Sequence, residues 1–278
     1  MGGPMRESLA IVVSFSMAVM LAQDASAQRR AAGGGRRAEP ASPVAEAAAL
    51  LASANPDELR LAFETLGASG SAAAVAPIAD RIRQGLPAPL LEAALDALLA
   101  LRRPEAGPVL FELVSHRRPA VRLRAVGAIV ALRPPGADRA LVAALADSDA
   151  RVRSAAATGL GQLGARDSVE TLFVALERGV YEAATSIGQL GGSEHVRRLL
   201  GLVGRVPFDV LTPALQEVIA RRDVDERTKL DVIARIGELA TPEARTFLRE
   251  VVASLPAGPG GRNAIRRAAE EAAARIVE

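Results

Sequence analysis

The chain of 278 residues contains no cysteine and no tryptophan, and only 3% of its residues are aromatic. The absence of cysteine excludes disulfide bonds, thiolate metal sites and cysteine nucleophiles together. Tyr181 is the only tyrosine, so the core must be built from alanine, leucine, valine and isoleucine. Such small apolar side chains let helices approach one another closely. The composition therefore predicts no large pocket furnished with aromatic rings.

Positive charge comes almost entirely from arginine, since Lys229 is the only lysine. The formal net charge of the whole chain is +2, and residues 28–43 contribute four arginines against one glutamate. The part of the chain that follows residue 43 is formally neutral. A protein that binds nucleic acid is expected to concentrate basic residues on a folded face. The charge pattern therefore predicts that nucleic acid is not the partner.

The N-terminal 27 residues have the three-part layout of a secretory signal peptide. Arg6 precedes an uncharged apolar run from Leu9 to Ala22, and the small residues of Ala25-Ser26-Ala27 follow it. The run is short for a membrane-spanning helix, which needs about 20 apolar residues. The sequence predicts cleavage after Ala27, a periplasmic or secreted mature protein, and no stable membrane insertion after cleavage.

Leucine-type residues recur from one helical segment to the next with a spacing of 31 residues. Four positions show this period: Leu98, Ile129 and Leu160; Leu101, Leu132 and Leu163; Leu110, Leu141 and Leu172; and Val114, Leu145 and Leu176. A period in this range, filled with helical patterns, indicates stacked helical hairpins, each too small to bury its own apolar face alone. The fold predicted is all-α, an α-solenoid.

The periodicity divides the chain into segments. Residues 1–27 are the predicted signal peptide, 28–43 a disordered linker rich in Arg, Gly and Pro, and 44–254 the solenoid, with an inserted helix near 207–223. A second linker at 255–261 precedes a terminal capping helix at 262–278. The repeats are predicted at about 56–85, 87–117, 118–148, 149–179, 180–206 and 224–254.

Helix-end signals support these boundaries. Gly164 follows the first helix of the fourth repeat, where a left-handed C-cap is easiest for glycine. Asp167 and Glu170 then form a predicted Asp-x-x-Glu capping signal for the second helix. Thr241 and Pro242 are predicted to start the second helix of the last repeat, with proline at the first helical position.

The turn between the third and fourth repeats carries a family resemblance. It reads Asp147-Ser148-Asp149-Ala150-Arg151-Val152-Arg153, with Leu160-Gly161 further on. This resembles the HEAT-like repeat, especially the short bacterial form also found in phycobilisome lyase subunits. The resemblance implies a right-handed α-solenoid of about six helical hairpins.

The resemblance also implies a polar ladder along the turns. It assigns hydrogen bonds along the stack to Asp147 or Asp149 with Arg153, and to Arg122 in the preceding repeat. At the junction before Arg122 the aspartate positions hold His116 and Arg118, so the ladder is expected to be broken there.

Two further motifs are not predicted to form sites. Gly159, Gly161 and Gly164 match a dinucleotide-binding string, but that motif requires a preceding strand and a helix N-terminus. Here it lies at the end of a helix, so close packing explains it better. Glu194 and His195 resemble the His and Glu pairs of iron-binding HEAT hydroxylases, but one pair cannot supply four ligands. No catalytic, cofactor or metal residue is predicted.

The interpretation that remains is an exported, non-catalytic scaffold that binds a protein or peptide partner. The alternative is an accessory or assembly factor for an enzyme, as the resemblance to lyase subunits implies. HEAT-like arrays usually present their second helices on the concave side, so these helices are predicted to form a shallow groove of alternating charge. Its outward positions are Asp80, Glu112, Arg139, Glu170, Arg197 and Thr246, with Glu250 one turn later. The oligomeric state is left open.

Overall fold

The structure, a computed structural model, describes residues 42–256 and 263–276. The predicted signal peptide and nearly all of both predicted linkers lie outside these residues. In the described ranges the chain is α-helical without a β-strand: α2 Pro43–Leu50, α3 Pro56–Ala68, α4 Val75–Arg83, α5 Ala88–Leu101, α6 Gly107–Leu113, α7 Pro119–Leu132, α8 Ala137–Ala144, α9 Ala150–Leu163, α10 Val169–Glu177, α11 Glu182–Leu190, α12 Ser193–Leu200, α13 Phe208–Ala220, α14 Glu226–Gly237, α15 Pro242–Ser254 and α16 Ala264–Arg275. Short 3₁₀ turns precede α4, α6 and α10, at Ala72–Ala74, Pro104–Ala106 and Arg166–Ser168. None of the described helices is long and apolar enough to cross a membrane.

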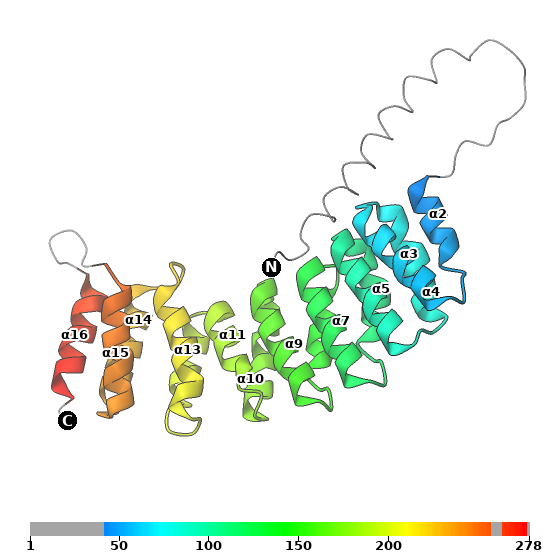
Figure 1. Ribbon diagram of the computed structural model, residues 1–278. Coiled ribbons are helices and arrows are strands. Elements are labelled where there is room, and N and C mark those ends of the chain that lie inside the picture. Colours follow the sequence, from blue (N-terminus) through cyan, green and yellow to red (C-terminus); the bar gives the residue numbers. More distant parts are fainter. Residues whose placement is uncertain (1–41, 257–262, 277–278) are drawn as a thin grey trace, which may run out of the picture. The chain divides into compact units, whose positions relative to one another are not determined.

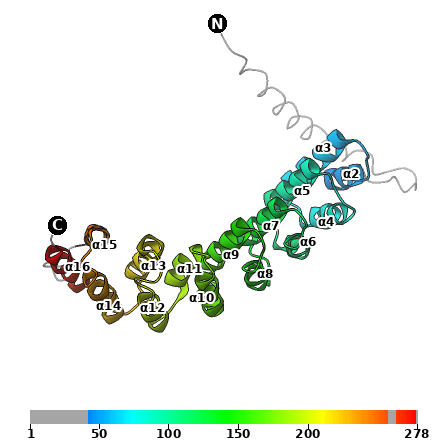
Figure 2. The same ribbon diagram turned by 90° about the horizontal axis from the view of Figure 1, so that it is seen from below.

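These helices form a row of antiparallel hairpins in two layers (Figure 1). The first-helix layer consists of α3, α5, α7, α9, α11, α13 and α15, and the second-helix layer consists of α4, α6, α8, α10, α12, α14 and α16. Each helix contacts the next member of its own layer or the partner in its hairpin, and α2 covers α3 at the N-terminal end (Figure 2). The predicted all-α solenoid is confirmed.

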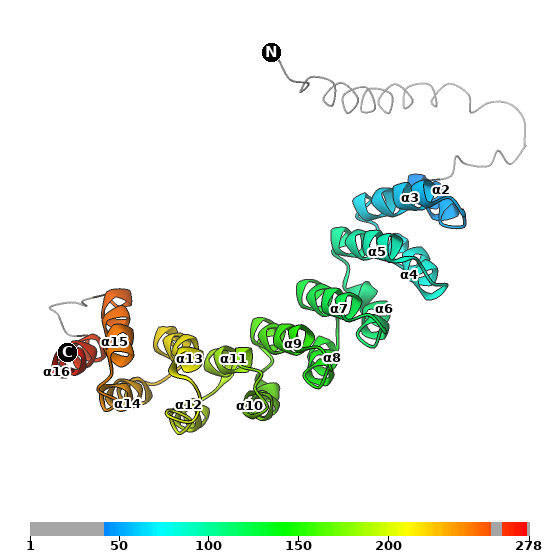
Figure 3. The same cartoon turned by 60° about the horizontal axis from the view of Figure 1, so that its bottom comes forward.

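The helix at 207–223 has a different place from the one the sequence indicated. α13 packs side by side with α11, so it continues the first-helix layer, and α14 then lies next to α12. The last hairpins are therefore α13 with α14 and α15 with α16 (Figure 3). α16, expected as a terminal cap, is the second helix of the last hairpin. The spacing of leucines does not show which layer a helix joins, because both helices of a hairpin have the same apolar spacing.

The two layers differ in spacing. Neighbouring first helices contact one another extensively from α7 to α13, whereas α6, α8, α10 and α12 scarcely touch one another. A row of hairpins curves toward its more closely packed layer, which here is the first-helix layer (Figure 3). The expectation that the second helices lie on the concave side is therefore wrong for this part of the chain.

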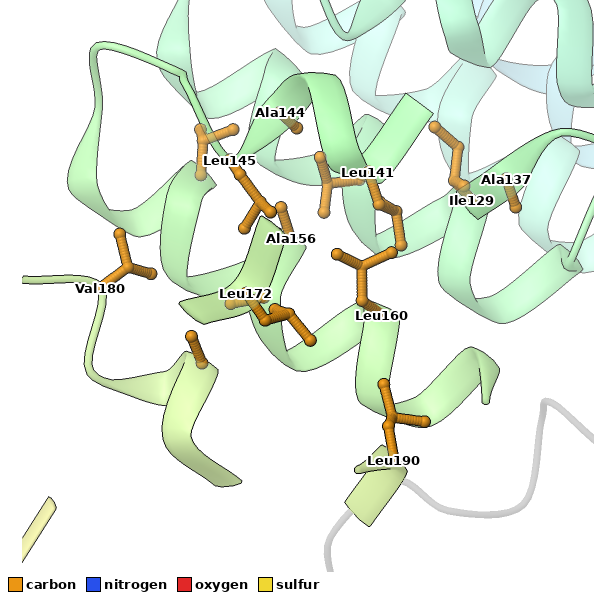
Figure 4. Packing of buried hydrophobic residues seen from close by; sticks show 14 of the residues in the cluster. Ile129, Ala137, Leu141, Ala144, Leu145, Ala156, Leu160, Leu172, Val180 and Leu190 are labelled. Atoms are coloured by element: carbon orange, nitrogen blue, oxygen red, sulfur yellow. The ribbon is translucent and has the colours of Figure 1, made fainter. Parts of the chain in front are cut away.

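The core runs between the layers, and each hairpin contributes to its neighbours' share of it. Ile129, Leu141, Leu160 and Leu172 are fully buried together although they come from α7, α8, α9 and α10 (Figure 4). Nine of the twelve leucine-type residues of the 31-residue period are buried, as predicted, and Val114, Leu132 and Leu163 pack partly buried against the core. Because these side chains fill space between hairpins, no single hairpin is stable alone.

Helix ends follow the local rules in part. The residue after α5, α7 and α9 is left-handed each time, at Arg102, Arg133 and Gly164, so the predicted Gly164 cap is confirmed. Thr241 caps α15 by accepting the Ala244 N–H at 3.2 Å, with Pro242 in the first turn, also as predicted.

Two local predictions were wrong. The Asp167 cap is absent, because residues 166–168 form a 3₁₀ turn and α10 begins without a side-chain cap. The fifth predicted repeat is four residues shorter than the preceding one at the turn that contains Tyr181, and this spacing predicts that Tyr181 packs there as a wedge. Its side chain is instead 47% exposed.

Candidate functional site: the two helix faces

The outward positions predicted from the sequence are divided between two faces. Asp80, Glu112, Arg139, Glu170 and Arg197 are exposed on α4, α6, α8, α10 and α12, one on each helix of the second-helix layer. Thr246 and Glu250 lie on α15, which belongs to the first-helix layer. The five former residues therefore share a face, and the last two do not belong to it.

Three of those five side chains are engaged in ion pairs with arginines of the second-helix layer, and the pairs of Glu112 and Glu170 bridge neighbouring helices. Arg83 binds Asp80 at 3.1 Å and Glu112 at 2.9 Å. Arg198 binds Glu170 at 2.8 Å and Glu177 at 3.3 Å. Exposed pairs of this kind contribute about 0–1 kcal/mol each. Among the described residues, Arg139 and Arg197 have no such ion-pair partner, so they remain accessible to an external group.

His195 belongs to the same local network. Its Nε2 lies 3.3 Å from a Glu170 oxygen, and its Nδ1 accepts the Gly192 N–H at 3.1 Å, which caps α12. The Arg198 guanidinium lies 4.0 Å from the centre of the Phe173 ring, at cation–π distance. In the described ranges no three histidine or carboxylate side chains are grouped as a metal site would require. His195 therefore has a structural explanation.

In the Gly159, Gly161 and Gly164 string, Gly159 and Gly161 serve helix packing and Gly164 ends α9. A Cβ atom at Gly159 would lie 2.5 Å from Val130 Cγ2, and one at Gly161 would lie 2.4 Å from Gln189 Oε1. These positions are in the C-terminal half of α9, away from any helix N-terminus. The glycines bring α7 and α11 close to α9, as the sequence interpretation favoured.

A buried ion pair forms the polar ladder of the turns. The Arg122 guanidinium donates from Nε and Nη2 to the two Asp147 carboxylate oxygens, each at 2.6 Å, and from Nη1 to the His116 carbonyl at 2.9 Å. These hydrogen bonds lower the pKa of Asp147 below its usual range. The implied ladder residues do meet, but Arg153 binds the Asp147 carbonyl at 2.7 Å and not its carboxylate. The ladder is structural.

The first-helix face is hollowed where neighbouring helices meet. A cleft of about 510 Å³ lies between α3 and α5, one of about 590 Å³ between α7 and α9, and one of about 310 Å³ between α13 and α15. Small residues contribute to the α7–α9 cleft. A Cβ atom at Gly127 would meet nothing within 4 Å, and Ala131, Ala155 and Thr158 are among the other lining residues. Sequence reasoning missed this face. The exposed Gly127 was the signal that could have indicated it.

Charge along the first-helix face is uneven. Glu64, Glu92 and Asp96 line the α3–α5 cleft with Arg60, and Asp96 is already paired with Arg124 of α7. The α7–α9 cleft contains Arg133 and no carboxylate. A ligand that spans several clefts would therefore meet acidic groups first and a basic group after them.

This geometry is that of a helical-repeat solenoid with two accessible faces. The model of the family of HEAT repeats matches residues 77–157 and 138–216, which together make half of the chain. The chain belongs to the HEAT repeat family.

Comparison with solved structures shows the fold alone. A homology model of the full-length AP-3 complex is 16% identical, with 84% of this chain and 50% of that chain covered and a TM-score of 0.50. The complex of CpcE and CpcF of phycocyanin lyase from Nostoc sp. PCC7120 is 18% identical over 91% of this chain and 100% of that chain, with a TM-score of 0.44. Human deoxyhypusine hydroxylase is 18% identical over 84% and 95%, with a TM-score of 0.40. No curated protein matches the sequence.

Proposed function

We propose that the mature chain is an exported, non-catalytic scaffold that binds a protein or peptide partner along its first-helix face. The observation that carries the proposal is the series of open clefts between neighbouring first helices. Clefts at three junctions of one helix layer suit an extended polypeptide, whose side chains can enter separate hollows along it. The first-helix face is favoured over the second-helix face because the predicted acidic groups there already bind arginines of this chain.

A capture experiment with paired variants tests which face binds. Gly127→Gln with Thr158→Gln fills the α7–α9 cleft with uncharged side chains, and both changes introduce a good helix former. Arg139→Glu with Arg197→Glu reverses the two unpaired charges of the second-helix face. Immobilised mature protein is exposed to a cell-envelope extract, and each captured partner is then titrated by calorimetry.

We expect the cleft-filling pair to weaken the measured affinity about tenfold or more, since blocking one contact of about 1.4 kcal/mol has that effect. The charge-reversed pair should bind as the unaltered protein does, and neither pair of changes should lower the melting temperature. Weaker binding by the charge-reversed pair, with unchanged binding by the cleft-filling pair, would assign partner binding to Arg139 and Arg197. Capture of a single enzyme whose assembly or activity depends on this chain would identify an accessory or assembly factor instead.

The proposal of export has its own test. The apolar run from Leu9 to Ala22 with Ala25-Ser26-Ala27 after it supports cleavage. Mass spectrometry of the protein from periplasm or medium should show Gln28 as the N-terminus. An intact Met1 or Met5 terminus in the cytosolic fraction would contradict export.

A further inference from the structure

The groove between α13 and α15 differs chemically from the other clefts of the first-helix face. Its main hollow, about 310 Å³, is lined by Phe208, Asp209, Thr212, Pro213, Glu243, Thr246, Phe247 and Glu250. The Phe208 and Phe247 rings meet edge to face with their centres 6.1 Å apart. A second hollow of about 180 Å³ continues along the same two helices and shares Glu250. The groove therefore offers two consecutive apolar positions with an acidic group between them.

The packing of α13 explains why the groove is open. α13 lies tightly against α11, where a Cβ atom at Gly188 would stand 2.3 Å from the Ala214 carbonyl oxygen. On its other side α13 touches α15 only sparsely, with the two phenylalanine rings between them. The groove is therefore open because α13 and α15 each pack mainly against other helices and only sparsely against one another.

The groove contains hydrogen-bond acceptors and no basic side chain. Asp209, Glu243 and Glu250 are exposed carboxylates in its lining, and no arginine or lysine joins them there. Glu250 accepts a hydrogen bond from Gln216 at 2.9 Å. Within the described ranges, Asp209 and Glu243 bind no arginine, lysine or histidine. Two negative charges beside an apolar surface are therefore left without a counter-charge from this part of the chain.

Pro213 leaves one backbone acceptor of α13 without its helical donor. It lies inside α13, where a proline has no N–H to donate. The Asp209 carbonyl consequently lacks the hydrogen bond that residue 213 would provide in a regular helix. Asp209 and Pro213 are both among the residues that line the groove.

We propose that this groove binds an extended segment of a partner polypeptide that carries an arginine beside an apolar residue. The proposal rests on the scaffold function and names the chemistry of its partner. A guanidinium has five N–H donors and no acceptor, which suits a site with unpaired carboxylates whose two threonine hydroxyls, Thr212 and Thr246, already donate to carbonyls of their own helices. It also stacks on aromatic rings and sheds water more easily than an ammonium group, so arginine fits better than lysine beside Phe208. The apolar neighbour enters the adjoining hollow.

The test uses mature protein and a fluorescein-labelled, end-capped octapeptide of alternating leucine and arginine, followed by fluorescence anisotropy. A second peptide has citrulline in place of arginine, which keeps the shape and removes the charge. The variant Asp209→Asn with Glu243→Gln removes two charges from the groove without changing its volume. The matched control, Asp138→Asn with Glu194→Gln, removes two exposed charges from α8 and α12 of the second-helix layer, where neither forms an ion pair with the described residues.

We expect the groove variant to weaken arginine-peptide binding about three- to tenfold, as the loss of two partly exposed charge contacts would. The control variant and the helical circular dichroism should be unchanged, and the citrulline peptide should bind no better to the unaltered protein than to the groove variant. Equal loss in both variants, or equal binding of the two peptides, would overturn the proposal.

Two further outcomes separate this proposal from the scaffold function. If the groove variant still captures the natural partner with unchanged affinity, the scaffold function stands and the groove assignment falls. If the unaltered protein captures no partner, the scaffold function fails whatever the octapeptide does. A peptide of residues 28–43 that binds the groove more tightly than the octapeptide would assign it to a segment of this chain and overturn the assignment to a partner.

Discussion

At the residue scale, glycines with the same helical backbone have opposite roles. Gly188 in α11 stands so close to Ala214 that any side chain would collide with a backbone carbonyl. Gly127 in α7 faces open space on the first-helix face. Both residues cost helix stability relative to alanine, but only at Gly188 does close packing compensate for that cost.

The same substitution at these two positions should therefore have opposite effects. We expect Gly127→Ala to raise the free energy of unfolding by about 0.5–1 kcal/mol, through helix propensity alone. Gly188→Ala should lower it by about 1–3 kcal/mol, because α13 must shift to admit the methyl group. Urea unfolding followed by circular dichroism measures both. A stabilising Gly188→Ala would show that the contact with Ala214 is looser than the structure has it.

At the element scale, the turns are held by polar side chains that reach from one hairpin to the next. Arg122 of α7 binds Asp147, which precedes α9, and Arg221 after α13 donates to the Gly188 and Gly191 carbonyls at the end of α11. These contacts join residues 25 to 33 positions apart, about one repeat. The stacking of hairpins is thus fixed by hydrogen bonds as well as by the core.

The ion pair of Arg122 and Asp147 should make stability sensitive to acid. Folding lowers the pKa of Asp147, so its contribution is complete above the pKa of an unfolded aspartate. It is lost as the pH falls through the lower pKa of the folded protein. We expect Asp147→Asn to lower the melting temperature by several degrees near neutral pH, with a smaller difference at about pH 3.

Calorimetric melts of the two proteins at both pH values measure this difference. Asp138→Asn is the matched control, because Asp138 is exposed on α8 and forms no ion pair with the described residues. A difference between Asp147→Asn and the unaltered protein that stays constant with pH would show that the Asp147 charge does not contribute to stability.

At the scale of the whole molecule, stability is shared along the row of hairpins. Leu160 is fully buried beside Ile129, Leu141 and Leu172, which belong to three other helices (Figure 4). Loss of one such side chain should therefore weaken adjacent repeats more than distant ones.

We expect Leu160→Ala to cost about 2–5 kcal/mol, the usual range for a buried leucine. Hydrogen exchange should accelerate in α7 to α11 and least in α2 and α16. Leu61→Ala is the control, because Leu61 is 55% exposed on α3 and should tolerate the change. Uniform acceleration along all described helices would instead indicate one cooperative unit.

The sequence by itself determined the elements and their core. The 31-residue period located the buried leucines, and Gly164, Thr241 and Pro242 located helix ends, because apolar spacing and capping depend on nearby residues alone. It also predicts the leader peptide, which remains a prediction. The turn residues further indicated the HEAT repeat family.

Only the tertiary structure decided which face each helix presents. α13 lies beside α11 because the chain returns from the second-helix layer to the first-helix layer after α12. No local sequence pattern indicates that crossing. Arg83 meets Glu112 across 29 residues, so the pair that occupies a predicted site residue exists only once the hairpins stack. The groove of Asp209, Glu243 and Phe247 likewise joins two helices that are separated in sequence by α14. The spacing of α13 and α15 brings these side chains together, and that spacing depends on how the neighbouring helices pack.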